Sequence, residues 1–158
     1  LREQQKRAQT IIPNSALICT NDLVYSYETK QIHPTMKRQV GERLAYNALV
    51  KKYGQTGFLC ESPEVDSYTF SGDTCIVTLK NDYNAISRFE GIQGFELAGE
   101  DRQFYKAVAY HDYTKGIVIT STQVKKPVAV RYCFRNFLIG NVANRAMLPL
   151  IPFRSDKF

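Results

Sequence analysis

The chain has 158 residues with a net charge of +6 at pH 7, and 44% of its residues are apolar and 23% charged. This length allows one good core, or one small domain with part of another, and the composition is ordinary for a globular protein. No run of about 18 apolar residues is present, so we expect no membrane-spanning helix. The basic residues are scattered without a known motif, so we do not expect nucleic-acid binding.

The N-terminal part is predicted to close an α/β domain. Leu1 to Gln9 favour a helix, begin without methionine and carry many charges, so we expect a piece of a longer protein. Residues 15–20 are almost continuously apolar, which predicts a strand buried on both faces, as in a parallel sheet. Asn21 and Asp22 end this strand, and a polar loop leads to His33.

An amphipathic helix is predicted from Pro34 and Thr35 to Tyr53, because proline favours the first turn and Gly54 suits a left-handed cap. Its apolar residues recur at three-to-four spacing, which predicts a helix packed on a sheet. These residues are Val40, Leu44, Ala48 and Leu49. We therefore assign residues 1–54 to the end of an α/β domain.

After Gly54 the apolar pattern alternates, and residues 55–158 are predicted to form an antiparallel β-sandwich. Residues 67–70 and 74–79 flank the turn Ser71-Gly72-Asp73 and predict a hairpin. Further strands are predicted at 94–98, 104–110, 116–120 and 128–134. Residues 140–158 are expected to be an extended tail, anchored by Leu148, Ile151 and Phe153.

The four cysteines are far apart in the sequence and lack the spacing of a zinc site. They are Cys19, Cys60, Cys75 and Cys133. Most lie in or beside apolar runs, where a thiol acts as a small hydrophobe, although one disulfide is compatible with an oxidising compartment. We expect neither a metal site nor an organic cofactor.

Of the two histidines, His33 has the more catalytic setting, because it follows a predicted strand and precedes a helix. A general base and a histidine that only stabilises its own turn fit this position equally well. No Gly-x-Ser-x-Gly motif is present, so a serine nucleophile would have to lie elsewhere in a parent protein. His111 lies in a predicted turn and is expected to be a solvated turn residue.

Two separated segments resemble bacterial sialate O-acetylesterases, which are SGNH-type serine esterases of carbohydrates. The first segment runs from Ile32-His33-Pro34 through Lys37, Val40-Gly41, Arg43-Leu44-Ala45 and Ala48-Leu49 to Tyr53-Gly54. The second comprises residues 127–132, Gly140-Asn141, Asn144, Leu148-Pro149 and residues 152–156, and residues 94–99 between them also fit. The resemblance therefore extends over nearly the whole chain.

The resemblance implies the last strand–loop–helix unit of a three-layer SGNH α/β/α domain, with His33 as the catalytic base, followed by the β-sandwich. The nucleophilic serine and oxyanion hole would lie in the N-terminal portion of the same enzyme, the expected partner of this chain. The implied reaction removes O-acetyl groups from sialic acid or a related acetylated sugar without a cofactor. The family also implies a secreted or periplasmic protein.

One feature departs from the family pattern. Many relatives have Asp directly before Ile-His-Pro, where this chain has Gln31, and the general SGNH pattern has Asp three residues before the histidine, where it has Lys30. A Ser-His dyad, Glu28 or another acid in the third role, or reduced activity would each account for this. Two alternatives to the esterase are a non-catalytic carbohydrate-binding module and an esterase-like protein without catalysis.

Overall fold

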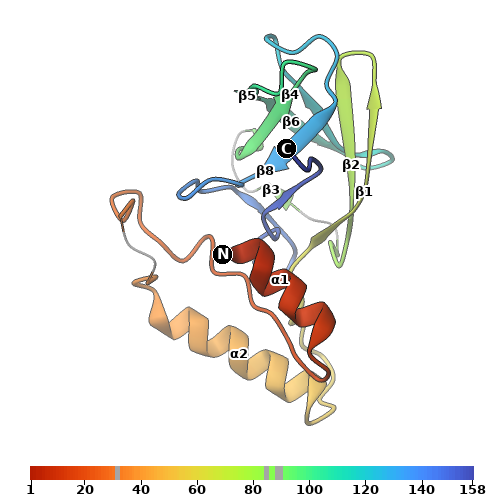
Figure 1. The fold of residues 1–158 in the computed structure, drawn as a ribbon. Coiled ribbons are helices and arrows are strands. Elements are labelled where there is room, and N and C mark those ends of the chain that lie inside the picture. The colour runs from red at the N-terminus through yellow and green to blue at the C-terminus, as the bar shows by residue number, and fades with distance from the viewer. Residues whose placement is uncertain (31–32, 84–85, 88–90) are drawn as a thin grey trace.

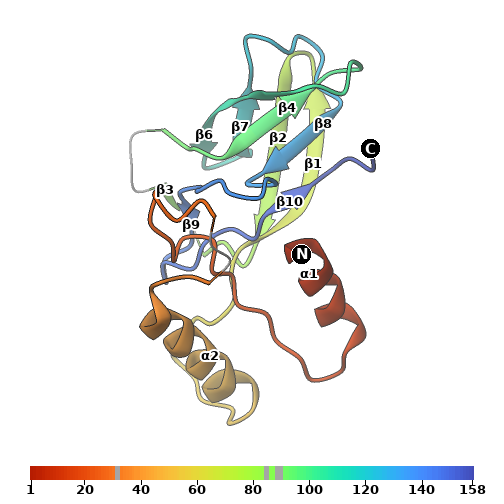
Figure 2. The same ribbon diagram turned by 60° about the vertical axis from the view of Figure 1, so that its left-hand side comes forward.

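The computed structural model describes residues 1–30, 33–83, 86–87 and 91–158. Two helices, α1 (Arg2–Ile11) and α2 (Lys37–Lys51), lie at the same end of a β-rich part that the later residues form (Figures 1 and 2). The predicted helices are thus both present. The chain is mostly β, with two four-stranded antiparallel sheets, one two-stranded pair and two helices in the described residues.

The two larger sheets each have four strands, and every neighbouring pair is antiparallel. The first has the order β1-β2-β7-β6, with β1 Glu64–Ser71, β2 Thr74–Lys80, β7 Gly116–Thr120 and β6 Val108–Asp112. The second has the order β10-β8-β4-β5, with β10 Phe153–Arg154, β8 Ala129–Tyr132, β4 Phe95–Ala98 and β5 Phe104–Lys106. Strands β3 (Ile86–Ser87) and β9 (Val142–Ala143) form a small third pair.

A single apolar core joins the two larger sheets. Buried side chains from both sheets belong to one contact cluster, so each sheet covers apolar surface of the other. In the second sheet, the rings of Phe95 and Tyr132 pack with their centroids 4.7 Å apart. The Tyr132 hydroxyl accepts the Val142 N–H at 3.1 Å, so this buried polar group is satisfied.

The predicted hairpin is confirmed by the pairing of β1 with β2. Ser71 lies opposite Thr74, which leaves a two-residue loop, and Gly72 adopts a φ of +59°. Glycine takes this left-handed region without the steric cost that a Cβ brings, which explains why the Ser-Gly-Asp sequence turns here.

The strand predicted at residues 104–110 is instead two strands that belong to different sheets. Strand β5 pairs with β4, whereas β6 pairs with β7. Ala107 lies between them, is 4% exposed, and donates its N–H to the Phe95 carbonyl at 3.1 Å. The apolar alternation continues through this crossing, so the sequence pattern alone merges the two strands.

The predicted strand at residues 15–20 is wrong for this chain, because these residues form no strand. A strand buried on both faces needs hydrogen-bonding neighbours on either side, and the described residues provide none there. The predicted anchors of the tail are confirmed, since Leu148, Ile151 and Phe153 are each at least nine-tenths buried.

Helix α2 has the predicted position but does not pack on a sheet through its predicted apolar face. Leu44 is 54% exposed and Ala48 is also exposed, whereas the buried residues of the helix are Arg43 and Asn47. Gly54 adopts a φ of +65° after the helix, in agreement with the predicted left-handed cap. The described residues therefore cover the apolar face of α2 only in part, because Val40 and Leu49 are half-buried whereas Leu44 and Ala48 are exposed.

The division into domains at Gly54 stays a prediction.

All four cysteines belong to the described residues and are buried free thiols, so the disulfide left open by the sequence is not formed. In the described part of the chain, neither helix is long and apolar enough to cross a bilayer.

Candidate active site

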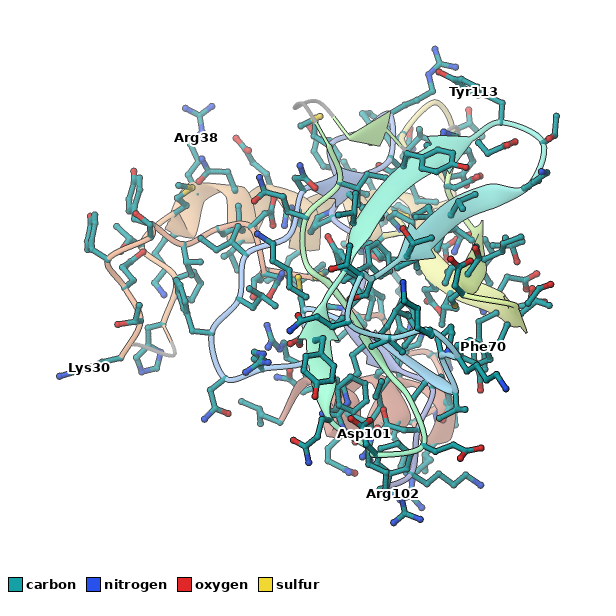
Figure 3. The ribbon with its side chains drawn as sticks, turned by 90° about the horizontal axis from the view of Figure 1, so that it is seen from above. Lys30, Arg38, Phe70, Asp101, Arg102 and Tyr113 are labelled. Carbon is teal, nitrogen blue, oxygen red and sulfur yellow. The ribbon has the colours of Figure 1, made fainter. Side chains whose placement is uncertain are left out.

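His33 lies in an exposed bend shortly before α2, within the loop that joins residue 22 to that helix. Its neighbours in sequence Lys30 and Arg38 project from the end of the molecule that lies away from Tyr113 and Phe70 (Figure 3). Among the hydrogen bonds that join described residues, none involves His33. Because His33 is exposed, a group from outside this chain can reach it.

Glu28, which the sequence leaves open as an acid partner of His33, is buried in the same loop with 4% exposure. One carboxylate oxygen accepts the Tyr25 N–H at 2.7 Å, and the other accepts the Thr35 hydroxyl. These two hydrogen bonds, with the positive charge of Lys37, hold the pKa of the Glu28 carboxyl below its usual range. Glu28 is thus an ionised acceptor whose two oxygens are both occupied.

Gln31 and Ile32, the two residues that precede His33 in the family motif, lie outside the described residues. Lys30, at the position of the aspartate in the general SGNH pattern, is exposed. Among the described residues, no carboxylate is hydrogen-bonded to His33, because both oxygens of Glu28 accept other donors.

The loop and α2 are joined by a partly buried ion pair between Arg43 and Asp22, which the sequence pattern does not predict. Arg43 is 9% exposed, and its guanidinium binds both carboxylate oxygens of Asp22, at 2.7 and 2.6 Å. It also donates to the carbonyls of Cys19 and Met147, so it links the loop, the helix and the C-terminal tail. Nothing in the local sequence signals this pairing, because its partners lie 21 or more residues away.

An open pocket of about 460 Å³ lies beside α2, but His33 is not among its lining residues. Tyr46 of the helix and Phe58 of the following loop line it, with their rings stacked at 5.4 Å between centroids. Met147 of the C-terminal part also lines the pocket. The pocket is therefore separate from the His33 loop.

His111 lies at the end of β6, where its ring packs edge-on against Tyr113 at 4.9 Å. It belongs to a strand and is half-buried, because the turn predicted from His111 begins two residues later, at Tyr113. In the described residues, no cluster of three or more His, Cys, Asp and Glu side chains is arranged to hold a metal ion.

Comparison with known proteins relates this arrangement to carbohydrate esterases. No family model matches the chain, and no curated protein matches it. Among solved structures, a carbohydrate acetylesterase from Xanthomonas citri superposes with a TM-score of 0.87 and is 33% identical. The match covers the whole of this chain but only 36% of that protein.

The chain thus has the fold of one part of a carbohydrate acetylesterase, and spans about a third of that enzyme's length. The match includes the helical part with the His33 loop as well as the β-rich part, since it covers 100% of the chain. The match agrees with the carbohydrate esterase part of the resemblance drawn from the sequence.

Proposed function

We propose that this chain is part of a serine esterase that removes O-acetyl groups from an acetylated sugar, with His33 as the catalytic base. The observation that carries the proposal is the 33% identity to a carbohydrate acetylesterase over the full length of the chain, at a TM-score of 0.87. The exposed position of His33 in the loop before α2 supports the assignment of the base.

In the proposed reaction, the imidazole of His33 accepts the proton of a serine hydroxyl as the serine oxygen attacks the acetyl carbonyl. The tetrahedral oxyanion collapses, the C–O bond to the sugar breaks, and the sugar hydroxyl leaves with the proton from His33. Water, deprotonated by His33, then attacks the acetyl-serine, and His33 returns the proton to the leaving serine oxygen as acetate is released. Every step is acid–base and acyl-transfer chemistry, so neither a metal nor an organic cofactor takes part.

The serine is proposed to lie in the N-terminal portion of the same enzyme, which would pack against the helical part of this chain. Two features support such a partner: the exposed Leu44 and Ala48 on α2, and the apolar residues 15–20, of which only Cys19 is buried. A parallel sheet beside residues 15–20 would supply the missing hydrogen-bonding neighbours and cover the apolar face of α2. We term the enzyme that contains both portions the parent protein.

Sialic acid is the proposed sugar because of the resemblance of residues 32–54 and 127–156 to sialate O-acetylesterases. The solved neighbour is described only as a carbohydrate acetylesterase, and we therefore propose O-acetylated sialic acid first and other O-acetylated sugars second. The same resemblance is the basis for proposing a secreted or periplasmic setting.

Carbohydrate binding without catalysis is the second candidate function, and exposed aromatic residues favour it. Tyr110 on β6 is 58% exposed, and Tyr113 in the following turn is 88% exposed and points away from the molecule (Figure 3). Aromatic rings that face solvent are suited to stacking against the apolar face of a sugar.

Acetate release by the parent protein separates these two functions. The substrates are an O-acetylated sialoside, an O-acetylated neutral pyranoside, and an N-acetylated sugar as the matched control with an amide in place of the ester. If the parent protein is an esterase, we expect it to release acetate from the O-acetyl esters and none from the amide. Saturable binding of these sugars without acetate release from any ester contradicts the esterase and favours the second candidate.

A further inference from the structure

Glu28 stands out in the His33 loop because it is buried among exposed residues. Its exposure is 4%, whereas its neighbour Tyr27 is 76% exposed and His33 is also exposed. A carboxylate is rarely buried unless hydrogen bonds compensate its charge. The burial of this acidic side chain therefore indicates that specific hydrogen bonds in the loop compensate its charge.

The contacts of Glu28 close the loop at both ends. At the first end, its carboxylate accepts the Tyr25 N–H at 2.7 Å, and its own N–H donates to the Tyr25 carbonyl at 3.0 Å. At the second end, the carboxylate accepts the Thr35 hydroxyl. The Thr35 carbonyl in turn accepts the N–H of Lys37, the first residue of α2, at 2.8 Å.

His33 lies inside this closed segment, two residues before Thr35. The charge-assisted bond from Thr35 to Glu28 anchors the chain two residues after His33, and the bond from Lys37 ties Thr35 to the start of α2. Both carboxylate oxygens are already occupied by other donors. Glu28 is thus built to hold the backbone that carries His33.

We propose that Glu28, acting through Thr35, is a positioning residue that fixes the His33 loop relative to helix α2. It does so without serving as the third member of a catalytic triad. Its importance for turnover rests on the proposed function, whereas its effect on the order of the loop does not. In this arrangement the ionised Glu28 carboxylate accepts one hydrogen bond from a backbone amide and one from a threonine hydroxyl.

The loop is tested first in this chain by nuclear magnetic resonance. Thr35→Val removes the hydroxyl at nearly constant volume, and Thr35→Ser retains it. We expect Thr35→Val to speed hydrogen exchange of the Tyr25 amide about 10-fold or more and to increase the motion of the His33 backbone, with Thr35→Ser close to wild type. The His111 ring signal, from the other end of the molecule, is the internal reference for an intact fold.

Turnover is then tested in the parent protein. If Glu28 positions the loop, we expect Thr35→Val to lower kcat by up to about 100-fold with little change in KM, because a misplaced base weakens transition-state stabilisation and not substrate binding. Thr35→Ser should restore most of kcat. Glu28→Gln should also lower kcat, since an amide presents one acceptor where the carboxylate has two, and Glu100→Gln in an exposed turn is its charge-matched control.

Two different results overturn the two proposals. A Thr35→Val loop that is as ordered as the wild-type loop, with unchanged kcat, overturns the positioning role of Glu28 whatever His33 does. Full turnover in a His33→Ala parent protein overturns the assignment of the base, even where Thr35→Val loosens the loop.

Discussion

At the scale of single residues, Asn144 holds the C-terminal tail against the rest of the chain. Its side chain is fully buried, and its amide nitrogen donates to the carbonyls of Glu61 and Asn81 at 2.9 and 3.3 Å. Its amide oxygen accepts the N–H groups of Ala146 and Leu148, both at 3.1 Å. Four backbone groups thus depend on one side chain.

Replacement of Asn144 by alanine is therefore expected to destabilise the fold by about 3 kcal/mol, because buried backbone groups lose their partners. Asn141 is the matched control, since its side chain also bridges two backbone groups, of Gln93 and Gly91, but is only half-buried. Asn141→Ala should cost about 1 kcal/mol, since water can replace the lost bonds. Denaturant unfolding measures both values, and equal losses for the two variants contradict this explanation.

Glu28 shows how far residue-level prediction could reach. Its position near His33 in the sequence made it a candidate triad acid, and its burial and its bond to Thr35 depend on how the loop folds. Sequence spacing places an acid near a histidine but does not say which donors its oxygens accept. The same is true of Arg43, whose salt bridge to Asp22 could not be predicted from helical periodicity.

At the scale of elements, α1 is attached to the β-rich part through polar contacts. None of its residues is buried, and its ion pairs join Glu3 to Arg154 and Lys6 to Glu64. Arg2 adds hydrogen bonds to Asn21 and to the carbonyls of Cys133 and Arg135. Partly exposed ion pairs of this kind each contribute about 1 kcal/mol or less and are screened by salt.

We therefore expect α1 to open more readily when salt is raised from 0.1 to 1 M, with exchange of its amides faster by about fivefold. Lys6→Gln at low salt should act in the same direction. Arg7→Gln, at an exposed position of the same helix, should have little effect. Hydrogen exchange with strand β2 as reference measures this, and α1 protection that does not change with salt would show that the ion pairs are not what holds the helix.

The elements that the sequence predicted correctly are those defined by local patterns. Alternation and a Ser-Gly-Asp turn define the β1–β2 hairpin, and three-to-four spacing with Gly54 defines α2. The strand predicted at residues 15–20 is absent because a strand exists only when another strand pairs with it. The crossing at Ala107 was not predicted, because distant partners and not the local pattern decide to which sheet a strand belongs.

At the scale of the whole molecule, the two parts of the chain differ in how well they are covered. The β-rich part has a common core of both sheets, whereas the helical part exposes Leu44 and Ala48 on the apolar face of α2. The match to one part of a longer carbohydrate acetylesterase is consistent with this contrast. We therefore expect the helical part to gain most of its missing packing from the remainder of the parent protein.

The measurement that tests the central claim most directly is acetate release from an O-acetylated sugar by the parent protein and two histidine variants. His33→Ala should lower kcat by at least about 100-fold, since general-base catalysis typically contributes about 10²- to 10⁴-fold. His111→Ala, the matched control at the end of β6, should leave kcat within about twofold of wild type, because this histidine lies outside the proposed machinery. A His33→Ala enzyme that turns over like the wild type would contradict the assignment of His33 as the catalytic base.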